Sequence, residues 1–394
     1  MIESCTVLEL ASVLAGPSVG QFFAELGATV IKVENPGTDG DVTRRWTLPH
    51  ETLSDDRSAY FCCCNYGKQS VALDLRTERG QDVLHTLVTE ADIVIANYRP
   101  GQAAALGADA DTLRRINPAL LYGHITGYGP DNPRPGYDAV IQAESGFMAM
   151  NGSADGPPTK MPVALMDVLA AHHLKEALLV GLLRRTQTGQ GAYVPVSLMQ
   201  AAVSGLANQA TNYLNTGHVP QRMGSAHPNI APYGTAYETA DTPVVLAVGT
   251  DRQFAALCDV LGCPARAEEK RFATNAVRVQ HREALDAVLR PRLAEQSADA
   301  LLTALHQRGV PAGAVRTLPA VFNDPHAAAM TLETDDASHP AGLRQTTFGS
   351  VPELPALRPP PRYAADTRAV LRNRLGYDDT AITALLENGI IACG

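Results

Sequence analysis

Short apolar runs alternate with helix-like stretches through the first part of the chain, and this alternation restricts the fold more than any other feature. Five runs rich in Val, Ile and Leu are predicted to be strands, at 6–10, 29–34, 70–75, 93–96 and 120–125. Helices are predicted between several of them, at 19–26, 78–91 and 101–115. Strands joined by helices of about ten residues form right-handed crossovers, so we predict an α/β fold with a doubly wound, Rossmann-like parallel sheet buried on both faces.

The loop after the first predicted strand lacks the glycine fingerprint that holds a dinucleotide pyrophosphate. The chain reads Ala15-Gly16-Pro17 at this point, and we expect Gly16 and Pro17 to break the chain before the helix at 19–26. Without that fingerprint, a dehydrogenase that binds a nicotinamide dinucleotide in the usual way is excluded.

Three segments follow from the pattern along the chain. The predicted large domain spans 1–224 and includes two long helices and a further strand, at 166–184, 198–215 and 193–197. The predicted smaller α+β domain spans 225–330, with a strand and three helices at 244–248, 252–261, 281–296 and 298–308. We expect 331–394 to return to the large domain, through a proline-rich extended stretch and a short helix at 352–361 and 379–388.

Charge and composition exclude several classes of partner. With 41 acidic and 32 basic side chains the formal charge is −9, and no block of Lys and Arg occurs, which argues against nucleic acid. No apolar run reaches the roughly 18–20 residues of a membrane span, and the N-terminal residues do not resemble a signal peptide. We therefore expect a cytoplasmic protein.

The seven cysteines are expected to be small buried side chains in a reducing compartment. No CxxC pair occurs, and the consecutive Cys62, Cys63 and Cys64 point in different directions and would chelate poorly. A zinc site is therefore not expected.

Asp167 is the carboxylate with the clearest potential for chemistry, because it lies at the start of a largely apolar predicted helix. Two interpretations are open on the residues alone. Asp167 could be the helix N-cap, or it could be a nucleophile that the amides and dipole of the helix N-terminus keep ionised. Spacing does not choose between them.

Three loops could line a binding pocket or could be ordinary surface turns. The loop at 127–138 combines glycines and prolines with Arg134, which suits a phosphate. The stretch at 97–101 follows a predicted strand, and open α/β sheets bind ligands at the carboxyl ends of their strands. His227 lies in a third loop, bounded by glycine and proline.

Taken together, these segments resemble the family III coenzyme A transferases over nearly the whole chain. The resemblance rests on the order and spacing of Leu14-Ala15-Gly16-Pro17, Val30-Ile31-Lys32-Val33-Glu34, Gly67-Lys68-Gln69-Ser70, Asn97-Tyr98-Arg99-Pro100-Gly101, Gly127-Tyr128-Gly129, Gly136-Tyr137-Asp138, Asp155-Gly156-Pro157-Pro158 and Thr188-Gly189-Gln190-Gly191.

The resemblance implies that Asp167 is a covalent nucleophile, and it also implies a set of coenzyme A contacts. These contacts are Leu14, Ala15, Asn35, Leu73, Asp74, Leu75, Arg76, Asn97, Tyr98, Arg99, Arg134, Pro135, Gly136, Tyr137 and Asp138. It further implies two interlocked chains in an obligate homodimer, with no metal and no cofactor beyond coenzyme A itself.

The stretches at 227–233 and 249–254 look like the branch of the family that uses succinyl-CoA and dicarboxylic acids. We therefore expect acyl-CoA and a short dicarboxylic acid as substrates. Arg222 and His227 are the candidates to pair with the distal carboxylate of the acceptor.

Two alternatives are open. An α-methylacyl-CoA racemase has the same scaffold, but its histidine falls where this chain has Tyr137, a weak base near neutral pH. A coenzyme A-binding module without catalytic activity is the other alternative. Deuterium exchange at the α-carbon would indicate the first, and an unmodified Asp167 after exposure to acyl-CoA would indicate the second.

Overall fold

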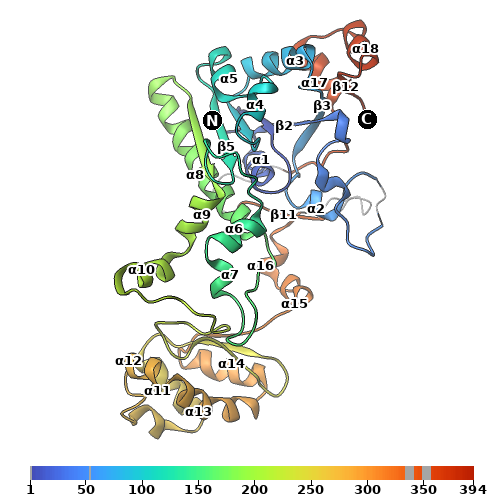
Figure 1. Cartoon of the computed structure of the whole chain (residues 1–394). Helices are drawn as coiled ribbons and strands as arrows, with labels where there is room; N and C mark the ends of the chain where they lie inside the picture. The colour runs from blue at the N-terminus through green and yellow to red at the C-terminus, as the bar shows by residue number, and fades with distance from the viewer. Residues whose placement is uncertain (1, 53–54, 333–340, 348–355) are drawn as a thin grey trace. The chain divides into compact units, whose positions relative to one another are not determined.

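A seven-stranded sheet forms the core of the larger of two compact units (Figure 1). The computed structural model describes residues 2–52, 55–332, 341–347 and 356–394. The order across the sheet is β12-β3-β2-β1-β4-β5-β6. The bounds of these strands are β1 Thr6–Leu10, β2 Thr29–Glu34, β3 Lys68–Leu73, β4 Ile93–Ala96, β5 Leu121–Thr126, β6 Ala192–Ser197 and β12 Ile391–Ala392. Strands β1 to β6 are parallel to their neighbours, which confirms the predicted parallel sheet, and β12 pairs antiparallel to β3.

Helices cover both faces of the sheet, as a doubly wound fold requires. Leu8 and Leu10 point into an apolar cluster that also contains residues of α3 (Glu78–Thr89), α5 (Ala110–Ile116) and α17 (Thr367–Leu375). Glu9 points to the opposite face, where α1 (Ala15–Glu25) approaches so closely that a side chain at Gly20 would collide with its carboxylate. On that face α1 packs against α8 (Leu165–Thr188), which runs along β5 and β6 (Figure 1).

Several helix boundaries differ from the predicted ones. Helix α1 begins at Ala15, so the predicted break at Gly16 and Pro17 is wrong: Pro17 lies in the first turn, where an N–H has no partner inside the helix. The stretch at 101–115 forms two helices, α4 (Gln102–Ala105) and α5, separated by Gly107 with a positive φ of 59°. The stretch at 198–215 divides into α9 (Leu198–Gly205) and α10 (Ala207–Thr216) in the same way.

The chain divides into two compact units. The first comprises 1–145, 161–214 and 328–394, and the second comprises 146–160 and 215–327. The boundaries predicted at 225 and 331 fall near those at 215 and 328, and the segment 146–160 joins the second unit. The remaining elements of the first unit are η1 Pro36–Thr38, η2 Val42–Arg45, α2 Ala59–Cys62, α6 Asp138–Glu144, β10 Thr331–Leu332, β11 Gly342–Leu343 and α18 Asp379–Glu387.

The second unit contains a small antiparallel sheet and helices around one apolar core. Its elements are β7 Tyr233–Tyr237, β8 Val244–Ala247, β9 Ala312–Ala314, α7 Phe147–Met150, α11 Asp251–Val260, η3 Pro264–Glu268, α12 Asn275–Gln280, α13 Arg282–Ala294, α14 Ala298–Gln307 and α15 Leu318–Phe322. A further short helix, α16 (Pro325–Ala328), ends at the boundary with the first unit. The predicted strand and the three predicted helices of this region are present.

The end of the chain packs on the first unit. Of the proline-rich stretch at 352–361, residues 352–355 lie outside the described part, and the rest has no regular structure. The carbonyls of Pro360 and Pro361 accept hydrogen bonds from Arg57 and Arg44. Within the described residues, every helix is too short or too polar to span a bilayer.

Candidate active site

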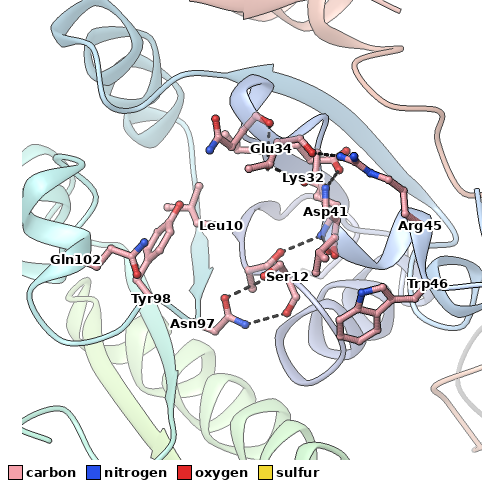
Figure 2. A pocket seen from close by; sticks show the side chains of 16 residues that line it. Leu10, Ser12, Lys32, Glu34, Asp41, Arg45, Trp46, Asn97, Tyr98 and Gln102 are labelled. Atoms are coloured by element: carbon pink, nitrogen blue, oxygen red, sulfur yellow. Dashed lines mark hydrogen bonds and ion pairs between the residues drawn. The ribbon is translucent and has the colours of Figure 1, made fainter. Parts of the chain in front are cut away.

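Two adjoining cavities lie where the strand order reverses, between β1 and β4. In open α/β sheets, ligands bind at this position, beyond the carboxyl ends of the strands. One cavity, the switch-point pocket, has a volume of about 680 Å³ and is drawn in Figure 2. The other, the Asp167 pocket, has a volume of about 420 Å³. Both are lined by Ser12, Asn97 and Tyr98, so one ligand could occupy both.

The loop after β1 is held in an unusual conformation between the pockets. The Asn97 amide donates to the carbonyl of Ser12 at 2.8 Å, and its oxygen accepts from the Ser12 N–H at 3.2 Å. Val13 has a positive φ of 74°, a costly conformation for a β-branched residue, and its N–H points to the Asp41 carboxylate at 3.3 Å. Side-chain contacts with Asn97 and Asp41 therefore hold this loop, which lacks the glycines of dinucleotide-binding loops.

A buried ionic network contacts this loop through Asp41. Lys32 pairs with Glu9 at 2.9 Å and with Asp41 at 2.8 Å, and Lys68 pairs with Glu9 at 2.7 Å. Burial opposes the negative charge of Asp41, but the Lys32 ammonium outweighs it and lowers the pKa of that carboxyl. The charges of this network therefore balance one another inside the protein.

Asp167 lies in the first turn of α8 and lines the Asp167 pocket. The N-cap residue of the helix is Ala164, so Asp167 does not cap it. Among the described residues, none donates a hydrogen bond to the Asp167 side chain. A carboxylate that faces a cavity without such a partner is available to a substrate.

Burial, with the charge of Asp138 as a second cause, raises the pKa of Asp167 to about 7. Burial thus opposes the ionised form that the nucleophile interpretation requires. Near neutral pH a substantial share of the carboxylate is ionised. That ionised share is a more basic nucleophile than an ordinary aspartate.

Asp138 contributes to this site by binding the segment that precedes Asp167. Its Oδ1 accepts a hydrogen bond from the backbone N–H of Met166 at 2.8 Å, and its Oδ2 accepts from the Gln142 amide at 2.7 Å. Gln142 in turn accepts from the N–H of Met161 at 2.8 Å. Helix α6 thus holds the segment that leads into α8. Asp138 does not line either pocket, and its contact with coenzyme A stays a prediction.

Most of the other predicted contacts surround the two pockets. The Asp167 pocket is lined by Leu14, Ala15, Asn97, Tyr98, Arg99, Arg134, Pro135, Gly136 and Tyr137. Asn35 lines the switch-point pocket instead.

The loop that carries four of these residues folds tightly on itself. A side chain at Gly136 would come within 2.4 Å of the Cα of Gly127, so both positions need glycine. Arg134 lies over the Tyr128 ring at 4.3 Å and pairs with Glu144 at 2.7 Å. These contacts give Gly127, Tyr128, Arg134 and Gly136 structural roles in this loop.

Other predicted residues lie elsewhere. Leu73 and Leu75 are buried in the apolar core, and Arg76 makes a bidentate pair with Asp74 outside both pockets. Arg222 and His227 belong to the second unit. For these six residues, contact with a substrate stays a prediction.

In the second unit, Arg222 donates to the carbonyls of Gly156 at 3.0 Å and Ala149 at 3.3 Å. Burial and the nearby Arg282 lower the pKa of His227, whose carbonyl also accepts a hydrogen bond from Arg282. Both side chains thus have structural contacts of their own.

Sequence reasoning missed the residues on one wall of the switch-point pocket. Arg45 and Trp46 line it opposite Tyr98 and Gln102 (Figure 2). In the sequence, this wall is marked only by a tryptophan that follows two consecutive arginines. That pattern does not show which of the two arginines is buried. Asp41, which holds the Val13 turn, was missed as well.

Comparison with known proteins gives consistent results. A family model described as CoA-transferase family III matches residues 2–367. A succinate–glutarate CoA-transferase of Agrobacterium fabrum is 39% identical over 390 residues, with 96% of this chain and 97% of the relative covered. A Mus musculus succinyl-CoA:glutarate CoA-transferase is 34% identical, with 99% and 90% covered. The crystal structure of a CAIB/BAIF family protein from Brucella suis superposes with a TM-score of 0.83 at 40% identity, over 94% of this chain and 98% of the other.

Proposed function

The chain belongs to CoA-transferase family III, and on that premise we propose that it transfers coenzyme A from succinyl-CoA to a short dicarboxylic acid through a covalent intermediate on Asp167. The observation that carries the proposal is the position of Asp167. Its carboxylate faces a cavity that adjoins the switch-point pocket, where this class of sheet binds nucleotides.

The names of the relatives support the choice of substrates. They are described as transferases that act with succinate and glutarate, with succinyl-CoA and D-citramalate, and with succinyl-CoA and mesaconate. Another is described as an acetyl-CoA:oxalate CoA-transferase. Succinyl-CoA as the donor and a dicarboxylate such as glutarate as the acceptor are therefore the first pair to test.

We place the two ends of coenzyme A in the two pockets. The thioester must reach Asp167, so the acyl group and the adjoining pantetheine arm occupy the Asp167 pocket. The arm passes the shared wall of Ser12, Asn97 and Tyr98. The nucleotide end then lies in the switch-point pocket.

The first half of the reaction loads the enzyme. An oxygen of the Asp167 carboxylate attacks the thioester carbonyl, the C–S bond breaks, and a mixed anhydride and the coenzyme A thiolate form. The thiolate attacks the side-chain carbonyl of Asp167, the C–O bond of the anhydride breaks, and the donor acid leaves as its carboxylate. The thioester is now on Asp167.

The second half returns the enzyme to its first state. The acceptor carboxylate attacks the carbonyl of the aspartyl thioester. The C–S bond breaks, the thiolate is released, and a second anhydride joins the acceptor to Asp167. The thiolate then attacks the acceptor carbonyl, and the Asp167 carboxylate leaves. One thioester has replaced another, so the free energy change is small and no ATP is needed. Catalysis rests on the positioning of three reacting groups around one carboxylate.

Trapping the intermediate tests this proposal. The protein is incubated with succinyl-CoA and hydroxylamine, digested, and examined by mass spectrometry. We expect a hydroxamate on the peptide that contains Asp167, and none in the absence of acyl-CoA or in Asp167→Asn. An unmodified peptide from a protein that still transfers coenzyme A would exclude the aspartyl mechanism.

The assembly and the acceptor contacts are further parts of the proposal. We infer a homodimer, as the resemblance implies, and exposed apolar side chains such as Val180, Leu183 and Leu214 support a surface that a second copy covers. Light scattering coupled to size-exclusion chromatography measures the mass of the assembly.

For the acceptor, we expect that Arg222→Gln raises KM for glutarate, because it removes a partner of the distal carboxylate.

A further inference from the structure

The switch-point pocket contains two cations, and they differ in their availability. Among the described residues that line it, only Lys32 and Arg45 carry a positive charge. The Lys32 side chain is 1% exposed and is paired with Glu9 and Asp41. The Arg45 side chain is 62% exposed. Arg45 is therefore the cation of this pocket that a ligand can reach.

The existing contacts of Arg45 are weak enough to be replaced. Its guanidinium donates to the carbonyl of Thr38 and lies 3.4 Å from the carboxylate of Asp39, whose own side chain is 78% exposed. Ion pairs between exposed side chains contribute little stability. A more highly charged ligand would therefore displace Asp39 with little loss.

The backbone that carries Arg45 is firmly anchored by its neighbour. Arg44 is buried, pairs with Glu34 at 2.6 Å and with Asp56 at 3.0 Å, and donates to the carbonyl of Pro361. The next residue, Trp46, lines the same wall of the pocket and has 41% of its surface exposed. An anchored turn thus places both a guanidinium and an indole at this pocket (Figure 2).

We propose that Arg45 binds a phosphate group at the nucleotide end of coenzyme A. This inference rests on the proposed function, because it requires coenzyme A in the switch-point pocket. A guanidinium binds phosphate through two parallel N–H bonds, and an aromatic ring such as that of Trp46, which is partly exposed, suits a stacked purine. Coenzyme A offers two such sites, the 3′-phosphate and the diphosphate, and the experiment distinguishes them.

The test is calorimetric binding to the full-length protein with three ligands. Coenzyme A carries both phosphate sites, dephospho-coenzyme A lacks the 3′-phosphate, and pantetheine lacks the whole nucleotide. The wild type is compared with Arg45→Gln, and we expect coenzyme A binding to weaken about 10-fold or more, the typical effect of losing a charge-assisted hydrogen bond. Binding avoids turnover, so the result does not depend on Asp167.

The pattern across ligands identifies the phosphate. If Arg45→Gln weakens coenzyme A but leaves dephospho-coenzyme A unchanged, Arg45 binds the 3′-phosphate. If both are weakened and pantetheine is not, Arg45 binds the diphosphate. Equal binding of coenzyme A by both proteins overturns the inference, and so does an equal loss for pantetheine. A wild type that binds no coenzyme A refutes the proposed function instead.

Two further variants control for general effects. Arg115 is an exposed arginine on α5 outside both pockets, so Arg115→Gln removes the same charge and should leave coenzyme A binding unchanged. Asp39 has a left-handed backbone with φ 49°, which asparagine tolerates, so Asp39→Asn should preserve the turn. Because it frees Arg45 and removes a negative charge, Asp39→Asn should tighten coenzyme A binding. Weaker binding by this variant would contradict the inference.

Discussion

Asp138 accepts a hydrogen bond from the backbone N–H of Met166 at 2.8 Å, and so fixes the residue immediately before Asp167. The same carboxylate is a source of negative charge that raises the pKa of Asp167, after burial itself. One side chain therefore affects both the position and the ionisation of the proposed nucleophile. These two effects can be separated by substitution.

Asp138→Asn keeps an oxygen that can accept from Met166 and removes the charge, although it gives up the hydrogen bond from Gln142. The pKa of Asp167 then falls, and the rise of kcat/KM with pH shifts to lower pH by up to about one unit. Asp138→Ala loses the hydrogen bond as well and should lower kcat about 10-fold or more. The measurement is a pH–rate profile for each variant.

Asp82→Asn is the matched control for that experiment. Asp82 is an exposed carboxylate on α3, outside both pockets, and its replacement should leave the profile in place. An unshifted profile in Asp138→Asn would mean that the charge of Asp138 does not reach Asp167.

The pH dependence of the wild type follows from the raised pKa of Asp167. The carboxylate attacks only when ionised, so kcat/KM should rise with pH and level off above a midpoint near 7. Asp167→Asn should lower kcat by about 10³-fold or more, because it removes the nucleophile. Full activity at pH 5 would show that the free enzyme keeps this carboxylate ionised, against the effect of burial.

The buried ionic network around Lys32 predicts a strong effect of substitution on the stability of the folded protein. Lys32→Met leaves Asp41 without its ammonium partner inside the protein, and we expect a loss of about 3–5 kcal/mol. The low pKa of Asp41 gives the sign of the pH dependence: its contribution is present above the ordinary pKa and is lost as the pH falls through the folded value. The deficit of Lys32→Met should therefore be larger at pH 7 than at strongly acidic pH, as measured by chemical denaturation.

The sequence was sufficient to predict the parallel sheet, because strands buried on both faces are continuous apolar runs and helical stretches lie between them. It did not predict the helix breaks near Gly107 and Ala207, where single backbone conformations interrupt a continuous helical pattern. Nor did it predict β9, whose Ala312–Ala314 segment has no β-branched residue.

In the candidate site, too, some features could be predicted from the sequence and others could not. Asp167 was identified through the family resemblance, since its local sequence fits an N-cap equally well. The pKa of its side chain depends on burial and on Asp138, which lies on another helix, so the local sequence does not predict it. Which of Arg44 and Arg45 faces the pocket is decided by the carboxylates of Glu34 and Asp56, and these meet Arg44 only in the folded chain.

Asp167 should also lower the stability of the folded protein as the pH rises. Its folded pKa, about 7, lies above the ordinary value of 3.8, so its contribution to stability is fully present below the ordinary value and is lost as the pH rises through 7. Asp167→Asn removes the ionisable group and keeps the shape. Its melting temperature should therefore match the wild type near pH 4 and exceed it at pH 8, by about 2–4 °C for each kcal/mol relieved. Differential scanning fluorimetry across this range measures the difference, and a gap that is constant with pH would mean that Asp167 titrates normally and is well solvated in the free enzyme.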